Sequence, residues 1–150
     1  FINTTGSVIT RTITLTLLTA DGCTSTFSRQ IQIYPEVIAA FTDPGDYCSP
    51  ANIAFVNTST NASTYSWNFG NGVQSVMTNP SGNFVNVSDS ILNLEVTLMA
   101  TSIYGCTDTV SHDLIINPTP VADFITDLVS GCSPLTIQIT NNSMYGDTYN

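Results

Sequence analysis

Apolar and polar residues alternate along most of the chain with a period of two. Residues 92–100 (LNLEVTLMA) put Leu, Leu, Val, Leu and Ala on one side of an extended strand, and residues 10–17 (TRTITLTL) put Thr at every second position. Such alternation is typical of strands that bury one face, and no stretch shows the helical period of 3.6 residues. The pattern therefore predicts an all-β fold.

Turn residues divide the stretch between positions 36 and 118 into about seven short strands. The first is expected to end at Phe41, and the second turns Ile53 and Phe55 inward. Later strands are expected at 65–69, at 84–87, at 92–100 with Val96 and Leu98 inward, and at 106–116. Short strands separated by turns are typical of an antiparallel sandwich of two sheets.

The stretch 65–72 (YSWNFGNG) places three aromatic rings at alternate positions. Tyr65, Trp67 and Phe69 share one side of a strand, so we expect them in the core with the only Trp of the chain at its centre. An exposed aromatic platform for a sugar or another ligand is the alternative, although strand alternation already accounts for the spacing.

A turn is predicted directly after these rings. Gly70 and Gly72 permit positive φ at the end of the strand. The side chains of Asn68 and Asn71 can bond nearby backbone N–H groups.

The sequence repeats itself at a shift of 83 residues. Residues 1–17 align with 84–100, GCTST at 22–26 with GCTDT at 105–109, and, with one extra residue, CSP at 48–50 with CSP at 132–134. The repeat predicts three parts: the C-terminal part of one repeat (1–35), a complete repeat (36–118) and the N-terminal part of another (119–150). Partial repeats cannot close a core alone, so the natural polypeptide is expected to continue in both directions.

Composition narrows the range of partners. Thr, Ser and Asn supply 53 of the 150 residues, and charged residues only 9%. The formal net charge is −9, with Arg11 and Arg29 as the only basic side chains apart from one His. An acidic surface without a basic stripe argues against nucleic acid, and no apolar run is long enough to insert into a membrane.

Catalytic chemistry has little support in the sequence. His112 is the only histidine, and its neighbours Ser111 and Asp113 point to the opposite face of a strand, so they cannot form a triad with it. We expect His112 to be a solvated edge residue. No phosphate loop, HExxH or CxxC motif is present, so we expect neither an enzyme nor a zinc site.

The motifs of the complete repeat resemble those of the PKD (polycystic kidney disease) domain family. They are YxWxFGxG at 65–72, the preceding strand with CxPxxIxFxNxS at 48–59, Asn79-Pro80, and GCTDT at 105–109. The resemblance covers 36–118 and, by repetition, both ends. It is greatest to tandem repeats of large surface adhesins and secreted proteins of gliding Gram-negative bacteria. It implies an immunoglobulin-like sandwich with an extracellular, non-catalytic role.

One departure from the family lowers the expectation of a cofactor. The family carries Asp where this chain has Asn68 and Asn71, and some relatives bind Ca²⁺ near the start of the domain. Asp43 and Asp46 remain as weak calcium candidates. The simpler interpretation is that residues 43–46 form a turn, so no cofactor is expected.

Each repeat carries one Cys before its second strand (Cys48, Cys132) and one at its last hairpin (Cys23, Cys106). In such a sandwich these loops lie at opposite ends, about 25–35 Å apart, which is too far for a disulfide. We therefore expect disulfides between neighbouring repeats. Cys48 would pair with the counterpart of Cys106 in the next repeat, and Cys106 with the counterpart of Cys48 in the preceding repeat, so both partner cysteines would lie outside this sequence. Unpaired or differently paired thiols are the alternative.

Two kinds of sugar acceptor are present. Asn3 and Asn86 are among the Asn residues in N-x-S/T sequences, which an Asn- and Thr-rich chain produces by chance. Ser90 and Thr109 lie in Asp-Ser-Ile and Asp-Thr-Val sequences, which resemble an O-glycosylation acceptor of gliding bacteria.

The sequence thus predicts a structural segment of a long extracellular protein at the cell surface. Tandem sandwiches would form a semi-rigid stalk or filament shaft of an adhesin. The expected partners are neighbouring repeats of the same polypeptide and other copies of it in a filament or bundle. The alternative is an accessory module that helps a secreted hydrolase bind polysaccharide or protein. The exposed aromatics available for that role are Tyr47, Tyr104 and Tyr145.

Overall fold

A computed structural model describes residues 1–146 and 148 of the chain, and the described residues form strands and loops without a helix. The strands are β1 (Ile9–Leu18), β2 (Thr24–Ile33), β3 (Gly45–Cys48), β4 (Ala51–Ala54), β5 (Thr64–Asn68), β6 (Gln74–Ser75), β7 (Ser81–Phe84), β8 (Leu92–Thr101), β9 (Thr107–Asn117), β10 (Phe124–Thr126) and β11 (Ile139–Asn141). With no helix, this part of the chain has none that could span a bilayer.

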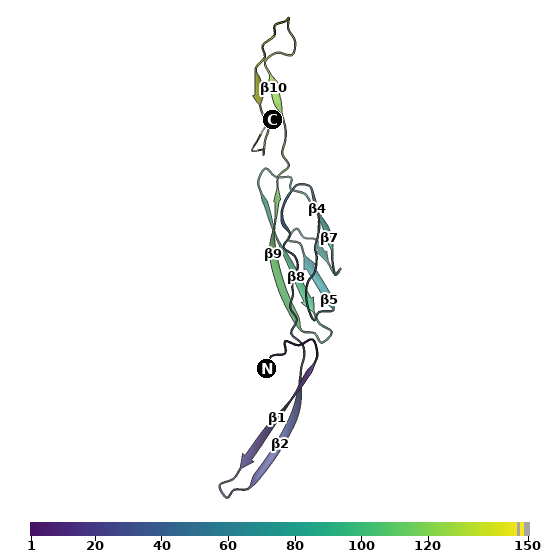
Figure 1. Ribbon diagram of the computed structural model, residues 1–150, viewed down its shortest axis with the longest axis vertical. Helices are drawn as coiled ribbons and strands as arrows, with labels where there is room; N and C mark the ends of the chain where they lie inside the picture. The colour runs from purple at the N-terminus through teal and green to yellow at the C-terminus, as the bar shows by residue number, and fades with distance from the viewer. Residues whose placement is uncertain (147, 149–150) are drawn as a thin grey trace.

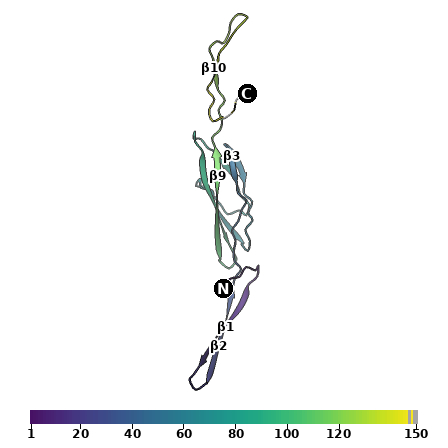
Figure 2. The same cartoon turned by 60° about the vertical axis from the view of Figure 1, so that its left-hand side comes forward.

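The molecule is long and narrow, with three parts in a row (Figure 1). The β1–β2 hairpin lies at one end, β3 to β9 form the body, and β10 and β11 lie at the other end. The same order is visible after rotation (Figure 2).

Two sheets face each other in the body. The larger has the strand order β3-β9-β8-β5-β6, in which only β3 and β9 are parallel. The smaller consists of β4 and β7, and isolated bridges at Phe41 and Ile38 bring the start of the repeat beside residues 57–60. One apolar cluster contains residues of both sheets, including Ile53 and Leu98. The predicted all-β, immunoglobulin-like sandwich is confirmed.

Trp67 lies at the centre of this core and is 0% exposed. Its ring lies 5.0 Å from that of Phe41 and 5.8 Å from that of Phe55, measured between centroids. The indole N–H donates a 3.0 Å hydrogen bond to the carbonyl of Met77, so the one polar atom of the ring has a partner. The other predicted core residues that are buried are Ile53, Phe55, Phe69, Val96 and Leu98, whereas Tyr65 is half-buried against the same cluster.

The turn after these rings is held by two Asn side chains. Asn68 accepts a hydrogen bond from the N–H of Gly70, and Asn71 accepts one from the N–H of Val73, each at 3.0 Å. Gly70 and Gly72 have φ of 74° and 86°, in the left-handed region that favours glycine.

One strand lies earlier than the sequence predicts. We expected a strand at 84–87, but β7 covers Ser81–Phe84. The chain leaves the sheet because Asn86 turns inward, where its amide donates to the carbonyls of Ser90 and Ile116, both at 2.8 Å. Its backbone N–H donates to the hydroxyl of Ser49.

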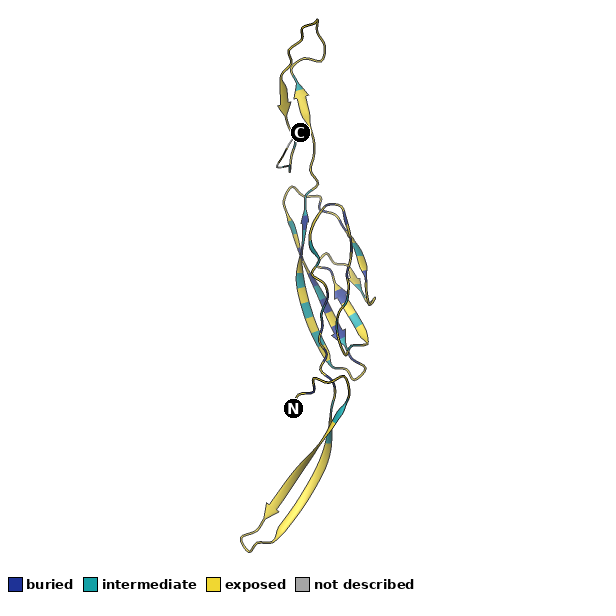
Figure 3. Cartoon of the chain, viewed as in Figure 1, coloured by how far each residue is buried: buried dark blue, intermediate teal, exposed yellow. Residues whose placement is uncertain are grey.

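The β1–β2 hairpin repeats the geometry of β8 and β9. Ile9 pairs with Ile33 as Leu92 pairs with Ile116, a shift of 83 residues. Their surroundings differ, because the hairpin has no second sheet over it among the described residues and is exposed except near the sandwich, where Ile9, Ile31 and Ile33 are half-buried (Figure 3). The division of the chain at 35 and 118 stays a prediction.

Candidate functional site: the two ends of the sandwich

The side chains that connect the three parts of the chain gather at the two ends of the sandwich. We call the contact between residues 1–35 and the sandwich the lower junction, and the contact between the sandwich and residues 119–146 the upper junction. The turn at residues 102–106 belongs to the lower junction, and the loop at 86–90 belongs to the upper one.

At the lower junction, the rings of Tyr34 and Tyr104 stack with centroids 4.3 Å apart and planes 7° apart. The N–H of Glu36 donates to the carbonyl of Asn3 at 2.9 Å. The amide of Asn61 donates to the carbonyl of Glu36 at 2.8 Å. These contacts hold the linker on both sides, so the junction is more than a covalent connection.

The upper junction is built in a similar way. Thr119 donates from its hydroxyl to the carbonyl of Ser49 at 2.9 Å. Tyr145 has a φ of 60°, and Asn61, its counterpart at a shift of 84, has 58°. Asn117 takes the position of Tyr34, so the tyrosine stack is particular to the lower junction.

Buried asparagines shape the upper end of each repeat. Asn3 donates to the carbonyls of Ser7 and Ile33, as Asn86 does to the equivalent carbonyls. Both side chains are buried, with their amide N–H groups in hydrogen bonds. In this fold neither amide is accessible for N-glycosylation.

The weak calcium candidates lie in the loop before β3 and in β3 itself. A carboxylate oxygen of Asp43 accepts a 3.0 Å hydrogen bond from the N–H of Gly45, and Asp46 lies in β3. The described part of the chain holds no cluster of three or more His, Cys, Asp or Glu side chains that could bind a metal ion. Any further calcium ligands would therefore have to be carbonyl oxygens or water.

The cysteines lie at the ends of the molecule's parts, and all four are free thiols in the structure. Cys48 pairs with Asn117 at the last residue of β9, whereas Cys106 precedes the first residue of this strand. An eleven-residue strand spans about 35 Å. A disulfide between Cys48 and Cys106 of one sandwich is therefore impossible, since it requires Cα atoms within about 7 Å.

The only histidine is not the solvated edge residue that we expected. His112 is half-buried in β9 on the side that faces the core, where its ring lies edge-on to Phe41 with centroids 4.6 Å apart. Ser111 points to the other face, where its hydroxyl bonds with that of Thr97 at 2.9 Å. The two side chains thus lie on opposite faces, and packing accounts for the histidine.

The two candidate O-glycosylation positions are exposed. Ser90 lies in the loop of the upper junction, and Thr109 lies in β9. The neighbouring Asp108 has a structural role, because its carboxylate accepts a 2.8 Å hydrogen bond from the backbone N–H of Ala39. This bond ties the first segment of the repeat to the last strand.

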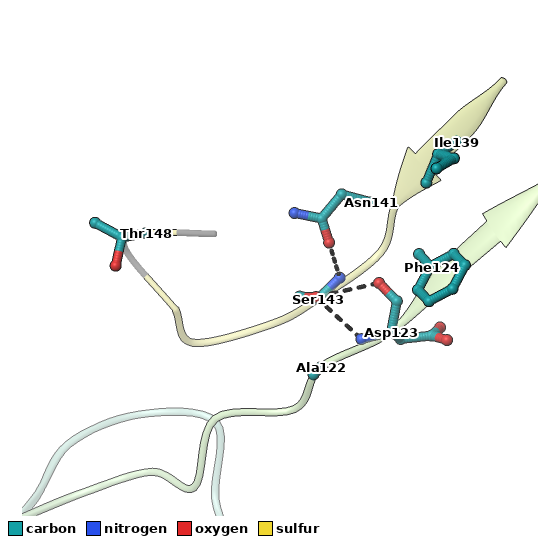
Figure 4. Close-up of a pocket in the computed structure, with 7 residues that line it drawn as sticks. All are labelled: Ala122, Asp123, Phe124, Ile139, Asn141, Ser143 and Thr148. Atoms are coloured by element: carbon teal, nitrogen blue, oxygen red, sulfur yellow. Dashed lines mark hydrogen bonds between the residues drawn. The ribbon is translucent and has the colours of Figure 1, made fainter. Parts of the chain in front are cut away.

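A hollow between β10 and β11 looks at first like a ligand site (Figure 4). Phe124 and Ile139 line it, and the hydroxyl of Ser143 bonds to the backbone of Asp123 at its edge. Shifted by 83 and 84 residues, these two apolar positions correspond to Phe41 and Phe55, which are buried in the sandwich core. The hollow is therefore the inner face of half a sandwich.

Comparisons with known proteins give structural neighbours only. No protein-family model and no curated protein matches the chain. The PKD1 domain of Vibrio anguillarum Epp is 22% identical with a TM-score of 0.46, and the match covers 55% of this chain and 95% of that one. The PKD1 domain of the Vibrio cholerae metalloprotease PrtV is 23% identical with a TM-score of 0.45, covering 55% and 98%.

Two of the neighbours are thus PKD domains, the family that the sequence motifs resemble. A third structure contains carbohydrate-binding modules of the β-sandwich superfamily. It is 18% identical with a TM-score of 0.46, and the match covers 61% of this chain and 46% of that one.

Proposed function

We propose that this chain is a structural segment of a long extracellular protein, in which tandem sandwiches form a semi-rigid stalk or filament shaft of a cell-surface adhesin. The observation that carries the proposal is the lower junction. A stacked pair of tyrosines and two backbone-directed hydrogen bonds fix the linker there.

The chemistry of the surface fits this role. Thr and Ser recur on the outer face of the long strands, as in the hydroxyl pair Thr97–Ser111 and its counterpart Thr14–Ser28. These hydroxyls are uncharged and hydrophilic. The chain as a whole has a net charge of −9, and such a charge favours solubility of a long molecule. An extracellular location and a relation to gliding bacteria are parts of the same proposal.

A binding module of a secreted hydrolase is the other candidate, and the aromatic side chains give it little support. Tyr104 is engaged in the stack with Tyr34. Tyr47 lies in β3, whereas Tyr145 lines a hollow at the upper junction to which Tyr47 does not contribute. A sugar platform needs aromatic rings that converge on one surface.

A distance measurement across the lower junction tests the proposal. Dyes on Cys23 and Cys48, with Cys106 and Cys132 replaced by serine, report the distance from the hairpin tip to the upper end of the sandwich by single-molecule energy transfer. We expect one narrow distribution near about 70 Å, the length of two long strands end to end. Tyr34→Ala removes the stack, so it should widen the distribution and raise the mean transfer efficiency.

Tyr145→Ala is the matched control, because Tyr145 is as exposed as Tyr104 and lies outside the interval between the dyes. It should leave the distribution unchanged. A broad distribution in the parent protein, or no response to Tyr34→Ala, would show that the junction is a flexible tether.

A further inference from the structure

We propose that a disulfide closes each junction, joining Cys48 of one repeat to the cysteine at the Cys106 position of the next. The proposal deepens the shaft function and rests on its end-to-end arrangement of repeats. It follows from three steps in the geometry of the two junctions.

Cys48 lies at the upper end of its sandwich, beside Asn117. The two residues pair in the parallel β3–β9 ladder, and Asn117 also donates from its side chain to the carbonyl of Tyr47 at 3.4 Å. Paired residues on neighbouring strands point to the same face of the sheet and lie about 5 Å apart. The exposed thiol of Cys48 is therefore a close lateral neighbour of the Asn117 side chain.

Tyr34 holds the position of Asn117 in the preceding repeat. Ile33 and Ile116, the residues before them, accept the same hydrogen bond from Asn3 and Asn86, at 2.7 and 2.8 Å. A cysteine at the Cys48 position of that preceding repeat would thus lie beside Tyr34.

The lower junction shows what Tyr34 faces. Its ring stacks on Tyr104, which lies two residues before Cys106 in the turn that bonds Ser102 to Cys106. Cys106 itself is half-buried against the cluster of Val37, Ala39 and Ala100, in which Val37 lies three residues after Tyr34. The lower junction therefore places the Cys48 position of the preceding repeat close to Cys106.

Cys23 and Cys132 lie at the equivalent ends of their own repeats. Cys23 lies at the lower end of its hairpin, in a turn with the hydrogen bonds of the Cys106 turn. Cys132 lies in the loop that corresponds to Cys48. The cysteine position that each of the four would face in a neighbouring repeat is not among the described residues, and all four are free thiols here.

The reaction is an ordinary thiol–disulfide exchange. The thiolate of one cysteine attacks a low-molecular-weight or protein disulfide and forms a mixed disulfide. The second cysteine, as its thiolate, then displaces the leaving thiolate and closes the S–S bond. The two cysteines lose two protons and two electrons, and the external disulfide is reduced to two thiols.

The full chain with residues 36–118 present twice in tandem contains one such junction with both cysteines. It is refolded with reduced and oxidised glutathione, and unreacted thiols are then alkylated. Because the chain has no Lys, it is digested with a protease that cleaves before Asp. Cys48 is then in the peptide of residues 46–88, and Cys106 is in the peptide of residues 89–107. We expect a linked pair of these peptides that disappears on reduction.

Serine variants show which copies are joined. Cys48→Ser in the first copy should abolish the linked pair, whereas Cys48→Ser in the second copy should leave it in place. Free Cys48 and Cys106 thiols in the unmodified tandem would overturn the proposal. A link that survives the first-copy variant would do the same, because it would involve Cys48 of the second copy, which faces no Cys106 position at its own junction. A narrow energy-transfer distribution without a crosslink would leave the shaft standing and reject only the disulfide.

Discussion

Replacing Trp67 with alanine is expected to lower the free energy of unfolding of the sandwich by about 3–5 kcal/mol. The indole is 0% exposed and packs against the rings of Phe41 and Phe55, so its removal leaves a cavity that the surrounding residues cannot fill. The Met77 carbonyl also loses its donor. Urea denaturation followed by far-ultraviolet circular dichroism gives the value without relying on the fluorescence of the missing ring.

Tyr47→Ala is the matched control for the tryptophan variant. Tyr47 is an aromatic residue on edge strand β3 and is 38% exposed, so its truncation should cost less than about 1 kcal/mol. A loss below about 1 kcal/mol for Trp67→Ala would contradict the placement of this ring at the centre of the core.

Gly70→Ala should be nearly as damaging, although it adds only one carbon. A Cβ at this position would lie 2.8 Å from the carbonyl oxygen of Glu95 and 3.0 Å from its nitrogen, both of which are backbone atoms of β8. The φ of 74° adds the cost of a left-handed conformation. We expect a loss of about 2–5 kcal/mol from the clash and the backbone strain together.

Gly72→Ala separates the two contributions. Gly72 has a similar φ of 86°, but nothing lies within 4 Å of its added Cβ. It should therefore lose only the conformational part, roughly 1–2 kcal/mol. Equal losses in the two variants, measured by the same denaturation experiment, would show that the close approach to Glu95 has no energetic effect.

The fold follows from the sequence because two independent patterns agree. The period of two places Val96 and Leu98 on one face, and the structure buries both. The shift of 83 residues then extends the same assignment to the hairpin, where the registers of β1–β2 and β8–β9 coincide. Local alternation and long-range repetition rarely coincide by chance.

The junctions were harder to predict, because their contacts join residues that no local pattern relates. The stack of Tyr34 on Tyr104 depends on how one repeat is placed on the next. In the sequence Asp108 stands out only as part of GCTDT and of the Asp-Thr-Val acceptor, yet its side chain bonds to the backbone of Ala39, which lies 69 positions away. In retrospect, the Tyr-Pro pair at 34–35 was the one visible signal.

The strand expected at 84–87 lies at Ser81–Phe84 for a related reason. The alternation of residues 84–87 (FVNV) is compatible with a strand, but it does not indicate that the amide of Asn86 will be buried and hydrogen-bonded. Asn86 satisfies two carbonyls from inside the fold and draws the chain out of the sheet. Similarly, His112 takes a core-facing position because its ring packs on Phe41, which composition alone does not indicate.

Small-angle X-ray scattering of chains with one, two, three and four tandem copies of residues 34–116 tests the central claim most directly, because these copies place Tyr34 after Ile116 at every internal junction, as it follows Ile33 in the chain. A semi-rigid shaft predicts that every added copy lengthens the particle by the same increment, about 35–40 Å, which is the rise of the long strands plus a linker. Increments that shrink with each copy, as the square-root growth of a flexible chain requires, would contradict it.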